Sequence, residues 1–205
     1  MLCSSLQAVV GTGDDNTDAA RIRAIGGPRA DVYGEMTHAG LRTMGQAIGL
    51  STTDRFLDLG SGDGGLVLQA PIDFGVVKSM GIELSQERHA RAVAAAESSV
   101  FKNAVAFVLG DAAGNEAIDL LRSASVVWCS NLLFDAPLQE RLAHHIASHG
   151  QDVRVVVSLK EYPGGIAGFH LQENRLAVEM SWTAGKHQKG HPPLPGHPCC
   201  VYTRR

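Results

Sequence analysis

The chain of 205 residues is poor in cysteine, contains no long apolar run and has no excess of positive charge. Its four cysteines include one adjacent pair and are otherwise far apart, which matches neither a disulfide framework nor a C-x-x-C metal knuckle. We therefore expect a reducing compartment and no metal site. No apolar run approaches the roughly 18 residues that predict a membrane span, and the first residues lack the features of a signal peptide.

The charge balance argues against an autonomous nucleic-acid binder. The formal net charge is -3, so we expect weak or no nucleic-acid binding by the chain alone. With 44% hydrophobic and 19% charged residues, the composition is that of a soluble globular protein, here expected to be a monomer. Residues 1–30 show little periodicity and predict a loose N-terminal arm, whereas residues 31–205 are long enough for one α/β domain.

Five short β-type runs alternate with helix-compatible sequence. This alternation predicts a parallel, doubly wound sheet, because parallel neighbours need a crossover connection, usually a helix. The five runs are RFLDLG (55–60), SMGIELS (79–85), AVAFVLGD (104–111), ASVVWCSN (124–131) and VRVVVSLK (153–160).

The end of the chain predicts an antiparallel hairpin. Two further β-type runs, at 175–183 and 198–204, are joined by a stretch rich in proline, glycine and histidine that has no helical pattern. We therefore expect a seven-stranded, mostly parallel α/β sheet ending in a hairpin, which resembles the Rossmann-like class I methyltransferases. A helix at about 38–48 carries apolar residues at i, i+3 and i+7 and should pack on this sheet.

The stretch FLDLGSGDGG at residues 56–65 matches two cofactor-binding patterns. Gly60, Gly62 and Gly65 satisfy the dinucleotide pattern G-x-G-x-x-G. Asp58, Gly60, Gly62 and Gly64 satisfy the acid-x-G-x-G-x-G loop of S-adenosylmethionine methyltransferases. Both patterns combine a strand, a glycine turn and a helix, which lets backbone N–H groups approach a ligand closely.

Charge separates the two cofactors. A dinucleotide pyrophosphate would meet the carboxylates of Asp58 and Asp63, and two like charges ~4 Å apart repel by roughly 4 kcal/mol at an effective dielectric constant near 20. S-adenosylmethionine instead carries a sulfonium and an ammonium, which these acids favour. Asp58 is the predicted ligand-binding residue, while Asp63 could equally cap the following helix.

Acidic residues end the second and third predicted strands. Glu83 lies 21 residues after Gly62, where either cofactor type places an acid that accepts both ribose hydroxyls. Asp111, followed by Ala112, lies where S-adenosylmethionine enzymes of this fold commonly bind the adenine amino group. The alternatives are an exposed strand-end carboxylate for Glu83 and an ordinary turn for Asp111.

Three further stretches give a more specific resemblance. DVYGEM (31–36), SVVWCSNLLFD (125–135) and SWT (181–183) occur in the right order around the glycine loop. Together they resemble the non-SET histone lysine methyltransferases of the disruptor-of-telomeric-silencing family. The resemblance implies that Tyr33 and Glu35 line the cofactor pocket.

The same resemblance implies the residues around the transferred methyl group. Ser130, Asn131 and Phe134 would lie beside the methyl group and the incoming lysine, and Asn131 would also contact the cofactor. Trp182 would form the lysine channel with Phe134. Without the motifs, Phe134 and Trp182 would be read as core residues.

The sequence departs from the family at three places. Ser130 replaces the first asparagine of a pair, Gly65 replaces a glutamine, and Cys199-Cys200 replaces an aromatic pair. These changes affect lysine positioning more than cofactor binding. Histidines at 187, 191 and 197, with Cys199, lack metal-ligand spacing, so a solvated loop is expected there.

The resemblance implies an S-adenosylmethionine-dependent protein lysine N-methyltransferase that acts on histone. Its partner would be a histone or nucleosome, its location nuclear, and its reaction an in-line displacement by a neutral lysine amine. Two alternatives stay open. One is a class I methyltransferase, cytoplasmic in that case, for a non-histone protein or a small molecule. The other is an S-adenosylmethionine-binding regulatory domain without turnover.

Overall fold

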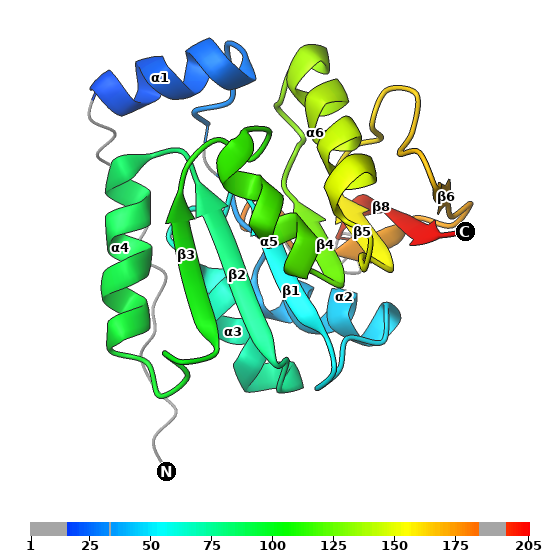
Figure 1. Ribbon diagram of the computed structural model, residues 1–205, viewed down its shortest axis with the longest axis horizontal. Helices are drawn as coiled ribbons and strands as arrows, with labels where there is room; N and C mark the ends of the chain where they lie inside the picture. Colours follow the sequence, from blue (N-terminus) through cyan, green and yellow to red (C-terminus); the bar gives the residue numbers. More distant parts are fainter. Residues whose placement is uncertain (1–15, 33, 185–195) are drawn as a thin grey trace, which may run out of the picture.

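A central β-sheet with helices on both faces organises the molecule (Figure 1). The computed structural model describes residues 16–32, 34–184 and 196–205. The sheet order is β3-β2-β1-β4-β5-β8-β6, and β7 pairs with β8. The strands are β1 (Arg55–Leu59), β2 (Lys78–Glu83), β3 (Val105–Leu109), β4 (Val126–Cys129), β5 (Val155–Ser158), β6 (Phe169–Leu171), β7 (Leu176–Val178) and β8 (His197–Arg204).

The first five strands are parallel and β8 pairs antiparallel with β5, β6 and β7. This arrangement confirms the predicted fold class, with a parallel sheet that closes on an antiparallel hairpin. The strand β6 was not predicted, because its three residues Phe-His-Leu are too few to show an alternation. β7 is shorter than the predicted run 175–183, whose last residues form a turn in which the Thr183 N–H donates to the Met180 carbonyl at 2.8 Å.

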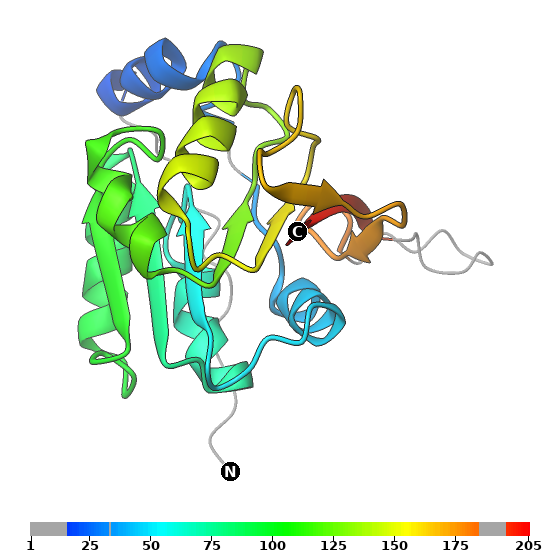
Figure 2. The ribbon, with the colours of Figure 1, turned by 45° about the vertical axis from the view of Figure 1, so that its right-hand side comes forward.

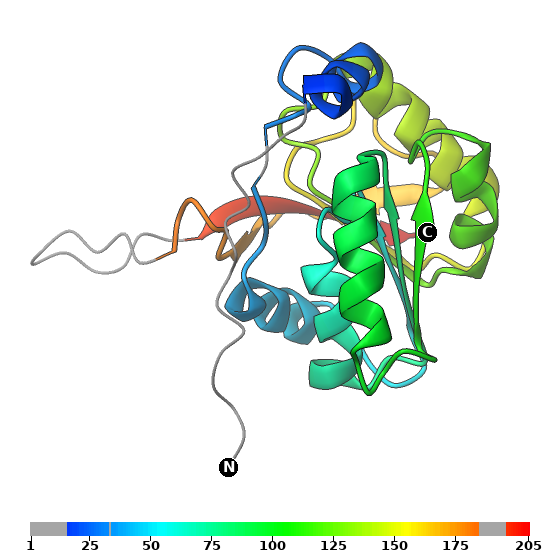
Figure 3. The same cartoon turned by 90° about the vertical axis from the view of Figure 1, so that its left-hand side faces the viewer.

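Helices cover the sheet in two layers, which are seen edge-on in Figure 3. Residue patterns explain where three helices begin, since the side chains of Thr37, Ser85 and Asp135 accept N-cap hydrogen bonds. One layer contains α2 (His38–Ala47), α3 (Gly65–Phe74) and α4 (Gln86–Glu97). The other contains α5 (Ile118–Ser123), preceded by the short 3-10 helix η1 (Asn115–Ala117), and α6 (Ala136–His149).

The core lies on both faces of the sheet because the central strands are buried on both sides. Along β4, Val127 and Cys129 join the cluster beneath α5 and α6. Val126 and Trp128 alternate with them and join the cluster beneath α2 and α3. The predicted helix at 38–48 is α2, and its Leu41 and Met44 are fully buried.

The predicted loose arm is wrong for residues 16–26. These residues form helix α1 (Asn16–Gly26), which lies over the carboxyl ends of β2 and β3 (Figure 1). Ala19 and Ile22 are buried on its inner face, and the spacing i, i+3 explains why one side is covered. Residues 1–15 lie outside the described part of the chain.

The C-terminal strands lie beside α2 (Figure 2). The Thr37 N–H donates to the Glu179 carbonyl at 3.1 Å, and Met36 forms an isolated antiparallel bridge with Met180. These bonds hold the segment between α1 and α2 against the C-terminal part of the chain. No helix among the described residues is long and apolar enough to cross a membrane.

Candidate functional site

A cavity of about 890 Å³ lies at the carboxyl ends of the parallel strands. Small-molecule sites in proteins occupy roughly 300 to 1,000 Å³ and, in open α/β sheets, lie at this end of the strands. The predicted site residues that line it are Glu35, Asp58, Gly60, Gly62, Glu83, Asp111, Ala112, Ser130 and Phe134. The sequence motifs thus converge on one cavity.

The glycine loop after β1 follows a path that glycine favours. Gly60, Gly62 and Gly64 have φ values of 88°, 54° and 83°, in the left-handed region where other residues are strained. A Cβ atom on Gly64 would also lie 2.5 Å from the Phe107 ring. The N–H groups of Gly60 and Ser61 both donate to the Ile82 carbonyl at 2.9 Å, so the loop is tied to β2.

Glu83 lies at the end of β2, is 7% exposed and lines the cavity. Its Oε2 atom accepts from the Gly62 N–H and its Oε1 atom accepts from the Ser85 N–H, both at 2.8 Å. A carboxylate has about four acceptor positions, so two remain after these bonds. Glu83 therefore has acceptor positions for two further hydrogen bonds.

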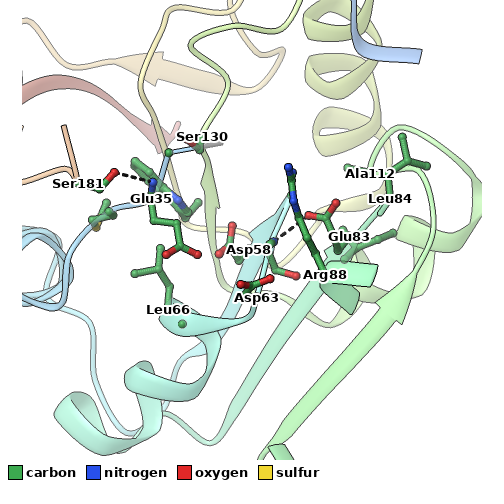
Figure 4. Close-up of a pocket in the computed structure, with 18 of the residues that line it drawn as sticks. Glu35, Asp58, Asp63, Leu66, Glu83, Leu84, Arg88, Ala112, Ser130 and Ser181 are labelled. Atoms are coloured by element: carbon green, nitrogen blue, oxygen red, sulfur yellow. Dashed lines mark hydrogen bonds between the residues drawn. The ribbon is translucent and has the colours of Figure 1, made fainter. Parts of the chain in front are cut away.

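Four carboxyl groups gather around one part of the cavity (Figure 4). They belong to Glu35, Asp58, Asp63 and Glu83. Burial, with the neighbouring charges of Glu35 and Glu83, raises the pKa of Asp58 well above its usual value. The Asp58 Oδ1 atom is buried and makes no hydrogen bond within the described part of the chain.

Glu35 has a similar electrostatic environment. Burial raises its pKa to about 7, the Asp63 carboxylate adds to the effect, and the Arg88 guanidinium opposes it. Asp63 pairs with Arg91 at 2.9 Å. The sequence left open whether Asp63 caps the following helix. It does not, because Gly64 occupies the N-cap position of α3.

Buried like charges with raised pKa values indicate a site for a positively charged ligand. Such a ligand would offset the repulsion among the carboxylates and occupy the unused acceptor of Asp58. A pyrophosphate would add charge of the same sign. The cavity therefore suits a cationic cofactor better than a dinucleotide, in agreement with the charge argument from the sequence.

The segment that carries Glu35 is fixed to the C-terminal part of the chain. The Ser181 N–H donates to the Glu35 carbonyl at 2.7 Å, and the Ser181 hydroxyl accepts from the Glu35 N–H at 3.2 Å. The Arg88 guanidinium donates to the Asp31 carbonyl at 3.2 Å. Tyr33, which was predicted to line the pocket, lies outside the described residues.

Asp111 and Ala112, which the sequence assigns to the adenine, follow β3 and line the cavity. The Asp111 Oδ1 atom accepts from the Ala113 N–H at 2.9 Å, and its Oδ2 atom lies 3.7 Å from the guanidinium of Arg141 on α6. These contacts fix the orientation of the carboxylate. Asp111 also forms the ordinary turn, since its carbonyl accepts from the Gly114 N–H.

Two of the four residues that were expected to be catalytic line the cavity. They are Ser130 and Phe134, and a Cβ atom on Gly60 would lie 3.9 Å from the Phe134 ring. Asn131 is fully buried, and its amide bonds to Lys160 and Gln139. It ties the end of β4 to the chain after β5 and is not among the cavity residues.

Trp182 also lies outside the cavity lining. It packs against the cluster beneath α2 and α3, and its ring stacks edge-on with His197 at 5.8 Å. A Cβ atom on Gly34 would lie 2.5 Å from the Trp182 ring, so Trp182 supports the backbone next to Glu35. Cys199 and Cys200 are buried in β8 and do not line the cavity, and His187 and His191 lie outside the described residues.

The sequence missed several residues that line the cavity. Arg88 and Leu84 follow β2, Ser181 comes from the C-terminal part, and Ile22 and Ile25 come from α1. The apolar spacing in α1 was a usable signal, whereas a buried arginine in the first turn of α4 has no distinctive pattern. The structure shows no group of three or more His, Cys, Asp or Glu residues suited to a metal ion among the residues it describes.

Comparisons with known proteins agree with this geometry. The family model described as "Histone methylation protein DOT1" matches residues 17–183. A "Histone-lysine N-methyltransferase, H3 lysine-79 specific" from Candida albicans is 26% identical over 194 residues, covering 83% of this chain and 14% of that protein. A protein of the same name from Emericella nidulans is 32% identical over 143 residues, covering 64% of this chain and 28% of that protein.

Solved structures share the fold. An RNA methyltransferase from Salinibacter ruber, in complex with S-adenosyl-L-homocysteine, has a TM-score of 0.53 and 20% sequence identity. The match covers 79% of this chain and 86% of that chain. This chain thus shares the fold of that structure over most of its length, but it spans less than a third of each of the two fungal relatives.

Proposed function

Because the chain belongs to the DOT1 histone methylation family, we propose that it binds S-adenosylmethionine and methylates a lysine side chain of a histone. The names of the fungal relatives point to histone H3 as the substrate. The family match is supported by the cavity, which contains the glycine loop and the strand-end acids of the motif in one place.

The observation that carries the proposal is the group of carboxylates around Asp58. Asp58 is 3% exposed, lies next to Glu35 and Glu83, and has a buried oxygen without a hydrogen bond to any described residue. This arrangement is costly without a cation. The ammonium and sulfonium groups of S-adenosylmethionine have the required charge, so the residues present fit this cofactor.

Each part of the cofactor has a matching set of residues. Glu83 would accept the two ribose hydroxyls, and Asp111 with Ala112 would hold the adenine. Asp58 and Glu35 would hold the ammonium group. When bound, S-adenosylmethionine supplies a methyl group on a positively charged sulfur, which a nucleophile can accept.

The transfer side of the cavity would be formed by Ser130 and Phe134. A lysine has an unperturbed pKa of about 10.4 and must lose its proton before it can act as a nucleophile. The ring of Phe134 disfavours the charged form by desolvation, while the Ser130 hydroxyl can accept a hydrogen bond from the amine. Positioning of the amine would supply most of the acceleration.

The proposed partner is therefore a histone or a nucleosome, and the proposed location is the nucleus. The formal net charge of -3 supports weak or no nucleic-acid binding by this chain alone. We also propose that the chain acts as a monomer.

A labelled methyl-transfer assay tests this function. The protein is incubated with methyl-labelled S-adenosylmethionine and nucleosomes, free histones or a nuclease-treated cell extract, and acid hydrolysis identifies the labelled amino acid. We expect label in methyl-lysine from a histone band. Label only in a non-histone protein or a small molecule would favour a different class I methyltransferase, and binding without transfer would favour a regulatory domain.

A further inference from the structure

Helix α1 forms one wall of the cavity. It lies across the carboxyl ends of β2 and β3, between the beginnings of α4 and α6 (Figures 1 and 3). Ile22 and Ile25 line the cavity, and the Gly26 carbonyl accepts from the Asp135 N–H at the start of α6 at 3.1 Å. An isolated helix of 11 residues is marginal in water, so α1 depends on these contacts for its position.

A continuous chain of hydrogen bonds leads from α1 to the glycine loop. The Asp18 Oδ2 atom accepts from the Ser85 hydroxyl at 2.8 Å and from the Glu87 N–H at 3.2 Å. The Ser85 N–H donates to Glu83 Oε1 at 2.8 Å, and Glu83 Oε2 accepts from the Gly62 N–H at 2.8 Å. Asp18 therefore acts on Glu83 through one intermediate residue.

The hydrogen bond from the Ser85 hydroxyl to Asp18 is not needed to cap α4. The Ser85 hydroxyl already accepts from the Arg88 N–H at 3.2 Å, which caps α4. A hydroxyl has one donor and can rotate, so its acceptor decides its orientation. Asp18 is that acceptor, so it fixes the Ser85 hydroxyl, while the Ser85 N–H binds the Glu83 carboxylate.

We infer that Asp18 is a positioning residue of the cofactor site, which through Ser85 orients the Glu83 carboxylate toward the ribose hydroxyls. The inference rests on the proposed function, because the ribose belongs to the proposed cofactor. With Asp18 in this role, α1 belongs to the cofactor site as well as to the outer layer of the domain. The charge on Asp18 also favours the start of α4, where N–H groups point toward it.

Binding of S-adenosylhomocysteine and its 2′-deoxyribose analogue tests the inference. Asp18→Ala should weaken binding of S-adenosylhomocysteine about tenfold, as expected when the Ser85 hydroxyl loses its charge-assisted hydrogen bond, but weaken the analogue only about twofold. Asp18→Asn keeps an acceptor and should lose about threefold. Asp119→Ala, which removes a carboxylate from α5 whose side chain is 92% exposed, is the control and should change neither constant.

A second measurement needs no ligand. Amide hydrogen exchange at Gly62 and Ser85, whose N–H groups bind Glu83, should become faster in Asp18→Ala and stay unchanged in Asp119→Ala. Equal weakening of both ligands, or unchanged amide exchange in a folded Asp18→Ala variant, would overturn the inference. Failure of the wild-type protein to bind S-adenosylhomocysteine would instead contradict the proposed function, and the exchange measurement would still decide the role of Asp18.

Discussion

Substitution of Asp58 by asparagine separates the stability of the fold from the binding of the cofactor. Asp58 is 3% exposed, and burial with the charges of Glu35 and Glu83 raises its pKa. An asparagine side chain at this position would have nearly the same shape without the charge. We therefore expect the ligand-free Asp58→Asn variant to be more stable than the wild type at pH 8, by about 1 kcal/mol, because a buried repulsion is removed.

The same change should impair cofactor binding. A carboxylate and an ammonium about 4 Å apart attract by roughly 4 kcal/mol at an effective dielectric constant near 20. Part of this is lost because the raised pKa means that Asp58 must release a proton before it pairs with the cation. The expected loss is about 2 to 4 kcal/mol, which is about a thirtyfold to thousandfold rise in the dissociation constant.

Calorimetry with three ligands makes the prediction specific. S-adenosylmethionine and S-adenosylhomocysteine both carry the ammonium group, whereas 5′-methylthioadenosine lacks the amino-acid part. Asp58→Asn should weaken the first two and leave the third unchanged. Equal weakening of all three ligands, or a variant less stable than the wild type, would refute the electrostatic reasoning.

Other substitutions test neighbouring parts of the site. The pKa of Glu35 is raised from 4.5 to about 7, so Glu35 takes up a proton as the pH is lowered through this range. Cofactor affinity should then fall, and the ligand-free protein should become more stable. Glu35→Gln should remove both trends, as measured by calorimetric titration and by thermal unfolding at several pH values. Glu83→Ala should weaken S-adenosylmethionine binding by about 2 to 3 kcal/mol and also lower the thermal midpoint, because two N–H groups lose their acceptor; an unchanged dissociation constant would exclude Glu83 from the site. Gly34→Ala should reduce affinity because its Cβ atom would lie 2.5 Å from the Trp182 ring, and Trp182→Leu in the same chain should restore part of it; no recovery would argue against this contact.

Most of the parallel sheet could be predicted from the sequence. Buried parallel strands are continuous apolar runs, and each such run here lies between helical stretches and turn residues. The residues that follow β1, β2 and β3 could be placed together because carboxyl ends of parallel strands share one edge. Glu83 and Asp111 were found in this way, and both line the cavity.

Contacts between distant segments could not be predicted. Asn131 was assigned to the site by family resemblance, but its amide binds Lys160, 29 residues away, and no local pattern reveals this pairing. Trp182 was assigned to a lysine channel by family resemblance, and its packing on Gly34 has no local pattern that reveals it. The helix α1 was missed because small residues and arginines weaken its apolar pattern, although Ala19 and Ile22 have the i, i+3 spacing of a buried helix face.

Mass spectrometry of nucleosomes after incubation with the protein and S-adenosylmethionine tests the central claim most directly. The account predicts that a histone lysine gains the mass of one or more methyl groups, in an amount that matches the S-adenosylhomocysteine released. The Asp58→Asn variant should give much less of both products at a cofactor concentration that saturates only the wild type. Release of S-adenosylhomocysteine with the added methyl group on a residue other than lysine, or no transfer by a wild-type protein that binds the cofactor, would contradict the proposed lysine methyltransferase.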